Sequence, residues 1–387
     1  MQIKTLKYKQ FESSDNYWNI QEINLEKINL LVGRNASGKS KTLSVINGFS
    51  RILENKSLIY TDGAYEIGFL HDNQTYLYIL KYLKGKIIQE KLILDKDTVL
   101  IDRKKDGKGT ITSCENLTTK FEIPLNELQA NRRDKTNFPY LEHFYFWASH
   151  VRIFNFSNST SKNAFAVKDP TKEATEFNIK NTDGGIIPTF NSGRKKHSQE
   201  FIDRIILDFN SIGFNIEDID LGSLSSVEFQ IIENPNAEIS AIRVKEKDLA
   251  CWTDQLDMSN GMFRALSIII HFNYYELEKI SGLVLIDDIG EGLDYERSCK
   301  LIELLISKAE KNQNMQIVMT TNDSFVMNSV DLKYWQIIDR EGCQIKYYNQ
   351  NNSPQNFADY KFTGLNHFDF FASGFYKNGF SEENDQD

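Results

Sequence analysis

The chain has 387 residues, of which 40% are apolar and 12% aromatic, and this is enough to bury one large core or two modest ones. The composition excludes a disordered chain, and the longest apolar runs are too short to cross a bilayer. The net charge of −9 argues against non-specific binding of nucleic acid over the whole surface. Four cysteines without metal-ligand spacing indicate a cytoplasmic protein with reduced thiols, and we expect no membrane partner.

The first 54 residues predict strands, a loop and a helix. Apolar and polar residues alternate from Ile3 to Tyr8, and the apolar run at 28–32 is typical of a buried strand. Apolar residues then recur at helical spacing through 40–54. The sequence therefore predicts that a loop at 33–40 connects the end of a buried strand to the start of a helix.

This loop matches the phosphate-binding motif G-x-x-x-x-G-K-[ST] at every fixed position, as Gly33-Arg-Asn-Ala-Ser-Gly38-Lys39-Ser40. The glycines let the backbone curl so that its N–H groups face phosphates, and the helix N-terminus adds partial positive charge. Lys39 is predicted to reach the β- and γ-phosphates of ATP, and the Ser40 hydroxyl to bind Mg²⁺. The alternative is a chance glycine-rich turn, which the flanking strand and helix disfavour.

Residues 64–115 predict an antiparallel meander, because alternating runs are separated by turn signals such as Asp106-Gly107. The stretch that follows is less regular. Asn155–Thr160 and Asn181–Ser198 are rich in polar residues and are interpreted as loops, and apolar spacing from 201 to 209 predicts an amphipathic helix. After Asn260 the pattern predicts a helix, a strand, a helix, a strand and a hairpin.

A second candidate site lies where the apolar strand 283–286 ends in two acids, Asp287 and Asp288. We expect a strand this apolar to be covered on both faces, as in a parallel sheet. Two carboxylates at its carboxyl end can hold Mg²⁺ and polarise an attacking water. Many strands end in acids that only cap a turn, and it is the pairing with the loop at 33–40 that favours a functional role.

Two further segments flank this strand, Ser259-Asn-Gly261-Met-Phe-Arg264 before it and Ile289-Gly-Glu-Gly292-Leu293-Asp294 after it. Their order and spacing resemble the ABC ATPase superfamily, with its Walker A loop, signature, Walker B strand and D-loop. The chain looks most like the bacterial AAA-type ATPases grouped with the overcoming-lysogenization-defect proteins and with SMC-type heads. Many of these act in phage defence or DNA maintenance. The resemblance covers about residues 1–115 and 250–350.

The resemblance implies a role for each matching residue. Asp287, with Ser40, would bind Mg²⁺, and Asp288 would take the place of the catalytic glutamate. The signature would reach the γ-phosphate held by a second protomer, although Ser259 also has the features of an ordinary helix N-cap. The residues implied in ATP binding are Gly33, Arg34, Asn35, Ala36, Ser37, Gly38, Lys39, Ser40, Lys41, Ser259, Gly261 and Asp294.

The sequence departs from the superfamily at two catalytic positions. Asp288 is one methylene shorter than glutamate, and a displacement of about 1 Å can cost on the order of 100-fold in rate. The strand at 316–321 leads to Asn322 where a histidine is usual, and asparagine can donate a hydrogen bond but carries no charge. With Lys39, Asp288 and Asn322 as the catalytic set, we expect slow hydrolysis. Gln74 and Gln129 are both candidates for the Q-loop glutamine.

The expected fold is α/β: a P-loop NTPase, ABC ATPase-like, with a mixed sheet, an antiparallel β-subdomain and an inserted helical lid. The expected parts are an N-terminal ATPase lobe at 1–115, the lid at 116–250, a C-terminal ATPase lobe at 251–350, and an aromatic segment with an acidic tail at 351–387. Three functions stay open: an ATPase that forms a homodimer and serves a separately encoded effector in anti-phage defence, a nucleotide-gated scaffold with negligible hydrolysis, and a DNA-stimulated ATPase.

Two surface features complete the expectations. Basic clusters at 102–108, 131–135 and 194–196 are candidates for nucleic-acid contact or are ordinary solvated loops. The aromatic segment is a candidate docking surface or packs on its own domain. Its members are Phe362, Phe368, Phe370, Phe371, Phe375 and Tyr376.

Overall fold

A computed structural model describes residues 1–10, 17–56, 61–155, 162, 166–168, 185–224 and 238–380. Most of the predicted loop at Asn155–Thr160 and the acidic tail after Phe380 lie outside these residues. The chain forms two compact units. The first unit comprises Met1–Ile153, Ser281–Asp287 and Asn314–Asp387, and the second comprises Phe154–Ile280 and Asp288–Gln313. The boundaries near 115 and 250 that the sequence suggested stay predictions.

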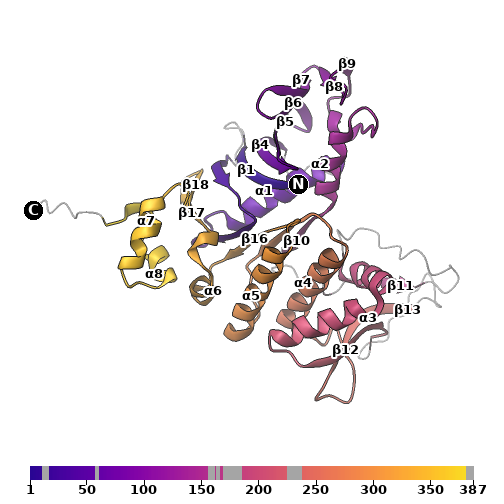
Figure 1. Ribbon diagram of the computed structural model, residues 1–387, viewed down its shortest axis with the longest axis vertical. Helices are drawn as coiled ribbons and strands as arrows, with labels where there is room; N and C mark the ends of the chain where they lie inside the picture. Colours follow the sequence, from indigo (N-terminus) through magenta and orange to yellow (C-terminus); the bar gives the residue numbers. More distant parts are fainter. Residues whose placement is uncertain are drawn as a thin grey trace, which may run out of the picture. The chain divides into compact units, whose positions relative to one another are not determined.

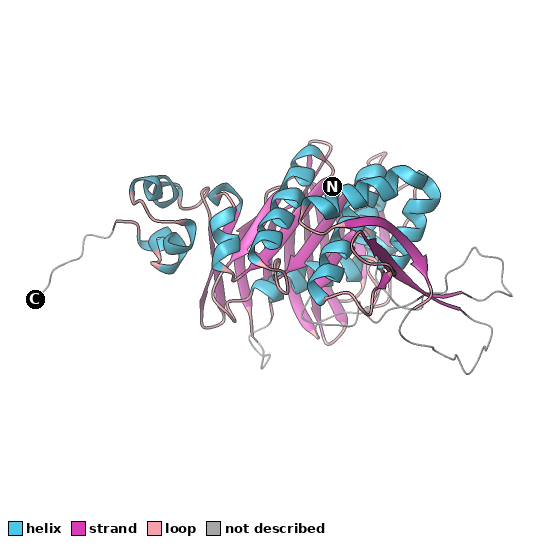
Figure 2. Ribbon diagram, turned by 90° about the horizontal axis from the view of Figure 1, so that it is seen from below, coloured by secondary structure: helices cyan, strands magenta, loops and turns pink. Residues whose placement is uncertain are grey.

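A single 14-stranded sheet underlies the first unit, in the order β10-β15-β16-β3-β17-β18-β2-β1-β4-β5-β6-β7-β8-β9, and its strands run side by side in Figure 2. The strands are β1 (Gln2–Lys9), β2 (Asn19–Asn24), β3 (Ile28–Val32), β4 (Asp62–His71), β5 (Gln74–Leu83), β6 (Lys86–Leu94), β7 (Thr98–Arg103), β8 (Lys108–Thr112), β9 (Thr118–Glu122), β10 (Val151–Asn155), β15 (Gly282–Asp287), β16 (Met315–Thr321), β17 (Trp335–Glu341) and β18 (Gln344–Tyr348).

The strands that carry the motifs form the parallel part of this sheet. β16 pairs in parallel with both β15 and β3, and β17 pairs in parallel with β3 on its other side. Every residue of β3, β15 and β16 is buried, as expected for strands covered on both faces. Because the strands are parallel, the loops after Val32, Asp287 and Thr321 leave the sheet at the same edge. The mixed α/β fold is confirmed, and so is the predicted order of a helix, a strand, a helix and a strand after Asn260, with a hairpin later.

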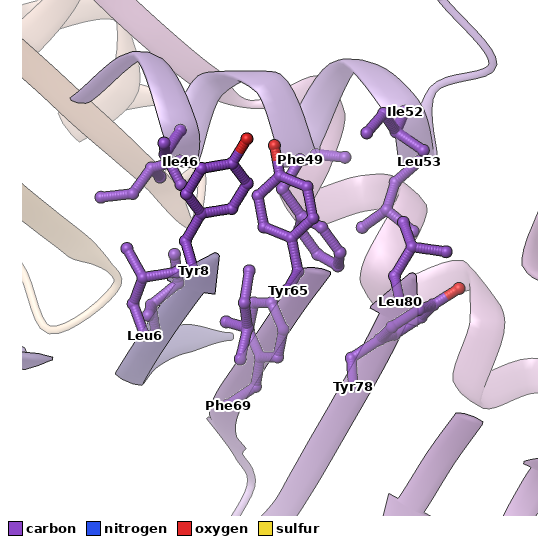
Figure 3. Packing of buried hydrophobic residues seen from close by; sticks show 14 of the residues in the cluster. Leu6, Tyr8, Ile46, Phe49, Ile52, Leu53, Tyr65, Phe69, Tyr78 and Leu80 are labelled. Atoms are coloured by element: carbon purple, nitrogen blue, oxygen red, sulfur yellow. The ribbon is translucent and has the colours of Figure 1, made fainter. Parts of the chain in front are cut away.

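Helix α1 (Lys39–Leu53) follows the loop and covers the neighbouring antiparallel strands. Figure 3 shows Ile46, Phe49 and Leu53 on its underside above the aromatic side chains of β1, β4 and β5. The Phe49 ring lies 5.3 Å from both Tyr65 and Tyr78, and each of these side chains is almost wholly buried. Burying an aromatic side chain of this size contributes about 1.5–3 kcal/mol, so this contact fixes α1 on the sheet.

The predicted meander is confirmed and is longer than expected, because it continues to β9 at Glu122. Its turns fall at Asp72–Asn73 and Lys84–Gly85, where the backbone φ angles are positive, as tight hairpins require. The Glu90 carboxylate is fully buried and accepts hydrogen bonds from the Tyr78 hydroxyl and from backbone N–H groups of the short helix η1 (Gln129–Asn131). Burial raises the pKa of Glu90. Helix α2 (Pro139–Ser149) packs beside α1.

The second unit combines three long helices with a small antiparallel sheet. Its sheet has the order β11-β13-β12, and β14 pairs with β13. The elements are α3 (Ile186–Ser211), α4 (Asn260–Leu277), α5 (Tyr295–Lys311), β11 (Ala166–Lys168), β12 (Ile216–Gly222), β13 (Glu238–Glu246) and β14 (Thr253–Asp254).

The interpretation of Asn181–Ser198 as a loop is wrong from Ile186 onward, where α3 begins. Two helical segments meet at Ser198, whose φ of 50° and ψ of −127° break the helix. The polar composition suggested a loop, but Phe190 packs against Phe201 with 5.9 Å between ring centroids. Tertiary packing of a few apolar side chains therefore overrides the weak local helix propensity of this segment.

Polar contacts between buried and half-buried side chains hold the three helices of the second unit together. The Asn273 amide of α4 donates to Asp208 of α3 at 2.6 Å, and Lys308 of α5 lies 2.9 Å from the same carboxylate. Lys308 also contacts Glu276 at 2.9 Å. Because each charge has an oppositely charged partner, these groups can leave much of their water without a large desolvation cost.

The C-terminal segment of the first unit forms short helices, drawn in yellow in Figure 1. They are α7 (Pro354–Asp359), η4 (Tyr360–Phe362), α8 (His367–Ala372) and α9 (Phe375–Asn378), and α6 (Ser324–Ser329) and η3 (Leu332–Tyr334) precede them. Phe370, Phe371, Phe375 and Tyr376 are buried against one another, so most of the aromatic segment packs on its own domain. Phe362 is the exception among these aromatics, with 83% of its surface exposed.

Acid is expected to loosen α9. Lys377 contacts Asp339 and Glu341 of β17 at 3.0 and 2.9 Å. Hydrogen bonds from Lys346 and next from Lys377 lower the pKa of Glu341 from its ordinary 4.5 to about 2. The contacts therefore stabilise the fold above about pH 4.5 and are lost as the pH falls toward 2. Hydrogen exchange at α9, corrected for intrinsic rates, should be faster at pH 2 than at pH 5 while β3 and β16 stay protected. Equal protection of α9 at both pH values would contradict this.

Within the described residues, no helix has both the length and the hydropathy of a membrane span. All four cysteines are free thiols, and three of them, Cys114, Cys251 and Cys343, are exposed.

Candidate functional site

The loop at 33–40 is closed around its own lysine. β3 ends at Val32 and α1 begins at Lys39, so the loop fills the turn between them. Lys39 is 7% exposed, and its Nζ donates to the carbonyl oxygens of Gly33 at 2.8 Å and Arg34 at 3.2 Å. Gly38 caps the helix without any side-chain hydrogen bond. The cap residue therefore has no side chain to accept hydrogen bonds from the first N–H groups of α1. These N–H groups can instead donate to an anion at the helix N-terminus.

Two glycines are required by the shape of this loop. A Cβ at Gly33 would lie 2.6 Å from Ser37 Oγ and 3.1 Å from the carbonyl oxygen of Ile338. Gly38 has φ +109°, and a Cβ there would lie 2.6 Å from the Trp18 ring. L-residues rarely adopt that backbone angle, and the loop has no room for a side chain at either position. The positions that the motif fixes as glycine are thus the ones where the fold needs glycine.

The hydroxyl of Ser40 and the carboxylate of Asp287 meet beside the loop. Ser40 Oγ donates to Asp287 Oδ1 at 2.9 Å, and Thr320 Oγ1 donates to the same oxygen at 2.8 Å. Asp287 and Thr320 are both buried. A hydroxyl and a carboxylate are the oxygen ligands that Mg²⁺ prefers, so these residues fit the expected cation together with phosphate oxygens. Among the described residues, no three His, Cys, Asp or Glu cluster as metal ligands.

Asn322 also reaches the loop. β16 ends at Thr321, and the Asn322 amide nitrogen donates to the Asn35 side-chain oxygen at 2.9 Å. Asp323, the next residue, caps α6 by accepting hydrogen bonds from Phe325 N and Val326 N. Asn322 is therefore held at the mouth of the loop, where it can donate a hydrogen bond to a ligand there.

Asp288 follows Asp287 directly but belongs to the second unit. Its φ is 50°, in the left-handed region, and its carbonyl oxygen accepts a hydrogen bond from Glu291 N at 3.1 Å. Among non-glycine residues, asparagine and aspartate adopt this conformation more readily than most. The backbone turn after the strand therefore gives a structural reason for aspartate in place of the glutamate that the superfamily pattern leads one to expect.

The signature and the D-loop pack against each other in the second unit. Ser259 is the N-cap of α4, because its Oγ accepts a hydrogen bond from Met262 N at 3.1 Å. A Cβ on Gly261 would lie 2.1 Å from the carbonyl oxygen of Gly292. Asp294 caps α5 in the same way, and its pKa is lowered chiefly by the hydrogen bond from Arg297 N. The capping role that the sequence left open for Ser259 is thus present.

The predicted site residues fall into two groups. The first unit brings together Gly33, Arg34, Asn35, Ala36, Ser37, Gly38, Lys39, Ser40, Lys41, Asp287 and Asn322. The second unit carries Asp288, Ser259, Gly261 and Asp294.

Three residues beside the loop were missed. Thr320 lies in the predicted strand at 316–321, where a polar residue within an apolar run is a signal that could have marked it. Trp18 packs on Gly38, and Arg340 donates to the carbonyl oxygen of Ala36 at 3.0 Å. Neither belongs to a motif, so no local pattern marks them.

The Q-loop candidates find no support. Asn131, two residues after Gln129, donates to the carbonyl oxygen of Ile52. Ile52 lies near the far end of α1 from the loop, a separation of about 20 Å at 1.5 Å per residue. Gln74 accepts a hydrogen bond from the Tyr76 hydroxyl at the β4–β5 turn.

The parallel strands, the glycine loop closed around Lys39, and the paired Ser40 and Asp287 define a P-loop ATPase of the ABC/AAA type. The chain belongs to the family described as "AAA domain, putative AbiEii toxin, Type IV TA system", whose profile matches residues 28–328. No match was found among curated proteins.

Solved structures similar to this chain include three SMC head domains. A head bound to the C-winged helix domain of ScpA has 14% identity and a TM-score of 0.47, over 90% of this chain and 97% of that one. The Thermotoga maritima head has 13% identity and a TM-score of 0.44, over 90% and 99%. A head with an extended coiled coil, bound to the C-terminal domain of ScpA derived from Pyrococcus furiosus, has 12% identity and a TM-score of 0.47, over 93% and 99%. The family assignment does not depend on these similarities.

Proposed function

We propose that this chain binds ATP with Mg²⁺, hydrolyses it slowly, and uses bound ATP to join two copies of itself. The observation that carries the proposal is the meeting of Ser40 and Asp287, with 2.9 Å between their oxygens, beside a loop that is closed around Lys39. Residues from distant parts of the chain meet there with the chemistry that a triphosphate and a divalent cation require.

Each residue of the first unit has a separate task. Lys39 leaves the carbonyl oxygens of Gly33 and Arg34 and contacts the β- and γ-phosphates, while the N–H groups at the start of α1 surround the phosphate oxygens. Ser40 and Asp287 would hold Mg²⁺, and the bound cation would neutralise negative charge on the phosphates. Thr320 keeps the Asp287 carboxylate oriented through its hydrogen bond. Asn322 donates to the γ-phosphate.

Dimerisation follows from the way the motifs are divided. The signature forms a helix N-terminus, at Ser259 and Gly261, that suits a phosphate on a second copy of the chain. A phosphate shared between one copy's loop and the other's signature stabilises the dimer, and its hydrolysis weakens the contact. Asp294, at the neighbouring helix cap, would pack across the same interface. The chain is thus proposed to act as a nucleotide switch.

A cellular role in anti-phage defence, with a separately encoded effector, is proposed from the resemblance to defence-associated ATPases. The family description, which names a toxin–antitoxin system, supports a role of this kind. A DNA-stimulated ATPase has less support, because much of the charge in two of the three basic clusters is paired. Arg132 and Arg133 contact Glu127 and Glu142, and Arg194 and Lys196 contact Asp220 and Glu278.

Asp288→Glu tests the enzymatic part of the proposal. A longer carboxylate should bring the oxygen closer to the attacking water and raise the single-turnover hydrolysis rate by about tenfold or more, since about 1 Å is worth on the order of 100-fold. Part of this gain is offset, because glutamate tolerates the φ of 50° less well than aspartate. The measurement is ATP hydrolysis with enzyme in excess.

The nucleotide-gated scaffold is the alternative that this experiment separates. Asp288 and the uncharged Asn322 are the observations that favour it. A rate increase in Asp288→Glu, abolished in Asp288→Asn, supports a slow enzyme. Hydrolysis in none of the three proteins, with ATP affinity intact in all, supports the scaffold. Thermal unfolding of each variant controls for backbone strain at position 288.

A further inference from the structure

We propose that Arg340 is a positioning residue that holds the phosphate-binding loop in its binding conformation and links it to the C-terminal helices. The inference rests on the proposed ATP binding at 33–40, and it assigns a role to a residue that no motif includes. Arg340 lies near the end of β17, within the first unit.

The contacts of Arg340 converge on the loop. Its Nη1 donates to the carbonyl oxygen of Ala36 at 3.0 Å, and its Nε donates to the carbonyl oxygen of Gly342 at 2.7 Å. Ala36 has φ 60°, a left-handed conformation that is strained for a non-glycine residue. A charged donor on its carbonyl oxygen opposes relaxation of this strained residue. The bond to Gly342 anchors the guanidinium to the β17–β18 hairpin, which is paired with the central strands.

Trp18 forms the second support. The guanidinium of Arg340 lies 4.7 Å from the Trp18 ring centroid, and the same indole packs against Gly38 at the other end of the loop. Lys41 Nζ lies 4.5 Å from that ring as well. Arg340 thus contacts the middle of the loop directly and its end through Trp18. An arginine can donate in two directions while it stacks on an aromatic ring, and a lysine cannot.

The charges around Arg340 keep it available for the loop. Its sequence neighbours, Asp339 and Glu341, extend from the opposite face of β17, because successive side chains of a strand alternate between its faces. Both contact Lys377 of α9, at 3.0 and 2.9 Å, and Glu341 also contacts Lys346 at 2.8 Å. Burial, and next the positive charge of Arg340, lower the pKa of Lys41. The region beside the loop is therefore cationic, which favours phosphate.

The link to the C-terminal helices follows from Lys377. If α9 moves away, Asp339 and Glu341 lose their partner in that helix, and the end of β17 that carries Arg340 is held less firmly. The loop would then be held less firmly, and ATP would bind less tightly. A partner protein that displaces α9 would lower nucleotide affinity without touching the nucleotide.

Calorimetric titration of the full chain with a non-hydrolysable ATP analogue and Mg²⁺ tests the inference. Arg340→Ala should raise the dissociation constant about tenfold, because it removes one charge-assisted hydrogen bond and the stacking of the guanidinium on Trp18. The dissociation constant of Arg340→Lys should be close to that of Arg340→Ala. Lys377→Ala should raise the constant by about two- to fivefold, as expected for a solvent-exposed ion pair. Lys333→Ala, an exposed lysine of the same unit, serves as the matched control and should bind as the wild type does.

A positioning role predicts that turnover of bound ATP at saturation stays within about twofold in Arg340→Ala, so that KM rises and kcat does not. Wild-type affinity in Arg340→Ala, or full rescue by Arg340→Lys, would overturn the inference, and the rescue would show that charge alone matters. Unchanged affinity in Lys377→Ala would overturn the link to α9, even if Arg340→Ala fails to fold. An absence of binding in the wild type would instead refute the proposed function.

Discussion

Replacing Lys39 by alanine is expected to reduce ATP affinity by at least about 100-fold. The Nζ of Lys39 is predicted to contact two phosphates, and each charge-assisted hydrogen bond contributes about 1.5–3 kcal/mol. Two such bonds correspond to about 3–6 kcal/mol, which is a factor of 100 or more at 1.4 kcal/mol for each tenfold. The measurement is calorimetric titration of ATP with Mg²⁺ present.

The fold should survive this substitution. Lys39 Nζ donates to carbonyl oxygens of its own loop, those of Gly33 and Arg34. Its removal therefore leaves the packing of α1 through Phe49 unchanged, and the unfolding temperature should move by no more than a few degrees. Lys361→Ala, an exposed lysine in the C-terminal segment, is the control for loss of charge. ATP affinity that persists in Lys39→Ala would refute the nucleotide site.

The same substitution tests the cellular role. If the chain is the ATPase component of a defence system, cells that express it with its neighbouring genes should form fewer phage plaques, and Lys39→Ala should remove that protection. Protection that persists without ATP binding would separate the defence role from the nucleotide switch. Equal plaque numbers with and without the wild-type protein would contradict the defence role and leave the ATPase proposal standing.

The sequence predicted the parts of the site whose chemistry is local. Lys39 and Ser40 sit in one short motif, where spacing alone determines geometry, and the buried run before Asp287 marks a parallel strand. Parallel strands bring their carboxyl ends to one edge of the sheet. The strand pattern therefore predicted that the loop at 33–40 and Asp287 would lie close together. The antiparallel meander was equally predictable, because the residues of each turn determine the hairpin that they connect.

The parts that could not be predicted depend on contacts distant in sequence. Trp18 and Arg340 lie 322 positions apart and meet only because the β17–β18 hairpin joins the sheet beside β2. The first half of α3 has a polar composition that indicates a loop, and a few buried side chains such as Phe190 decide otherwise. The sequence indicates only a catalytic role for Asp288, and the left-handed φ of this residue adds a conformational reason for aspartate that no sequence pattern expresses.

Gly261→Ala should destabilise the second unit and abolish ATP-dependent dimerisation. A Cβ at this position would lie 2.1 Å from the carbonyl oxygen of Gly292 and 2.7 Å from its carbon, and both are backbone atoms. Alanine favours a helix by about 1 kcal/mol over glycine, but overpacking against backbone costs about 1–3 kcal/mol. The clash is the larger effect, so α4 and the D-loop must move apart. The signature would then no longer present its N–H groups in the arrangement that a shared phosphate requires.

Sedimentation with a non-hydrolysable ATP analogue measures the dimer, and calorimetry measures binding to the loop. We expect Gly261→Ala to remain monomeric while it binds the analogue with wild-type affinity, because the loop belongs to the first unit. Gly85→Ala is the matched control: it has open space around its Cβ and a φ of +73°, so it loses on the order of 1–2 kcal/mol through backbone strain alone. If it dimerises normally at a similar loss of stability, the defect in Gly261→Ala arises at the signature. Normal dimerisation of Gly261→Ala would show that the signature takes no part in the interface, and the shared-phosphate switch would fail while nucleotide binding at Lys39 remained.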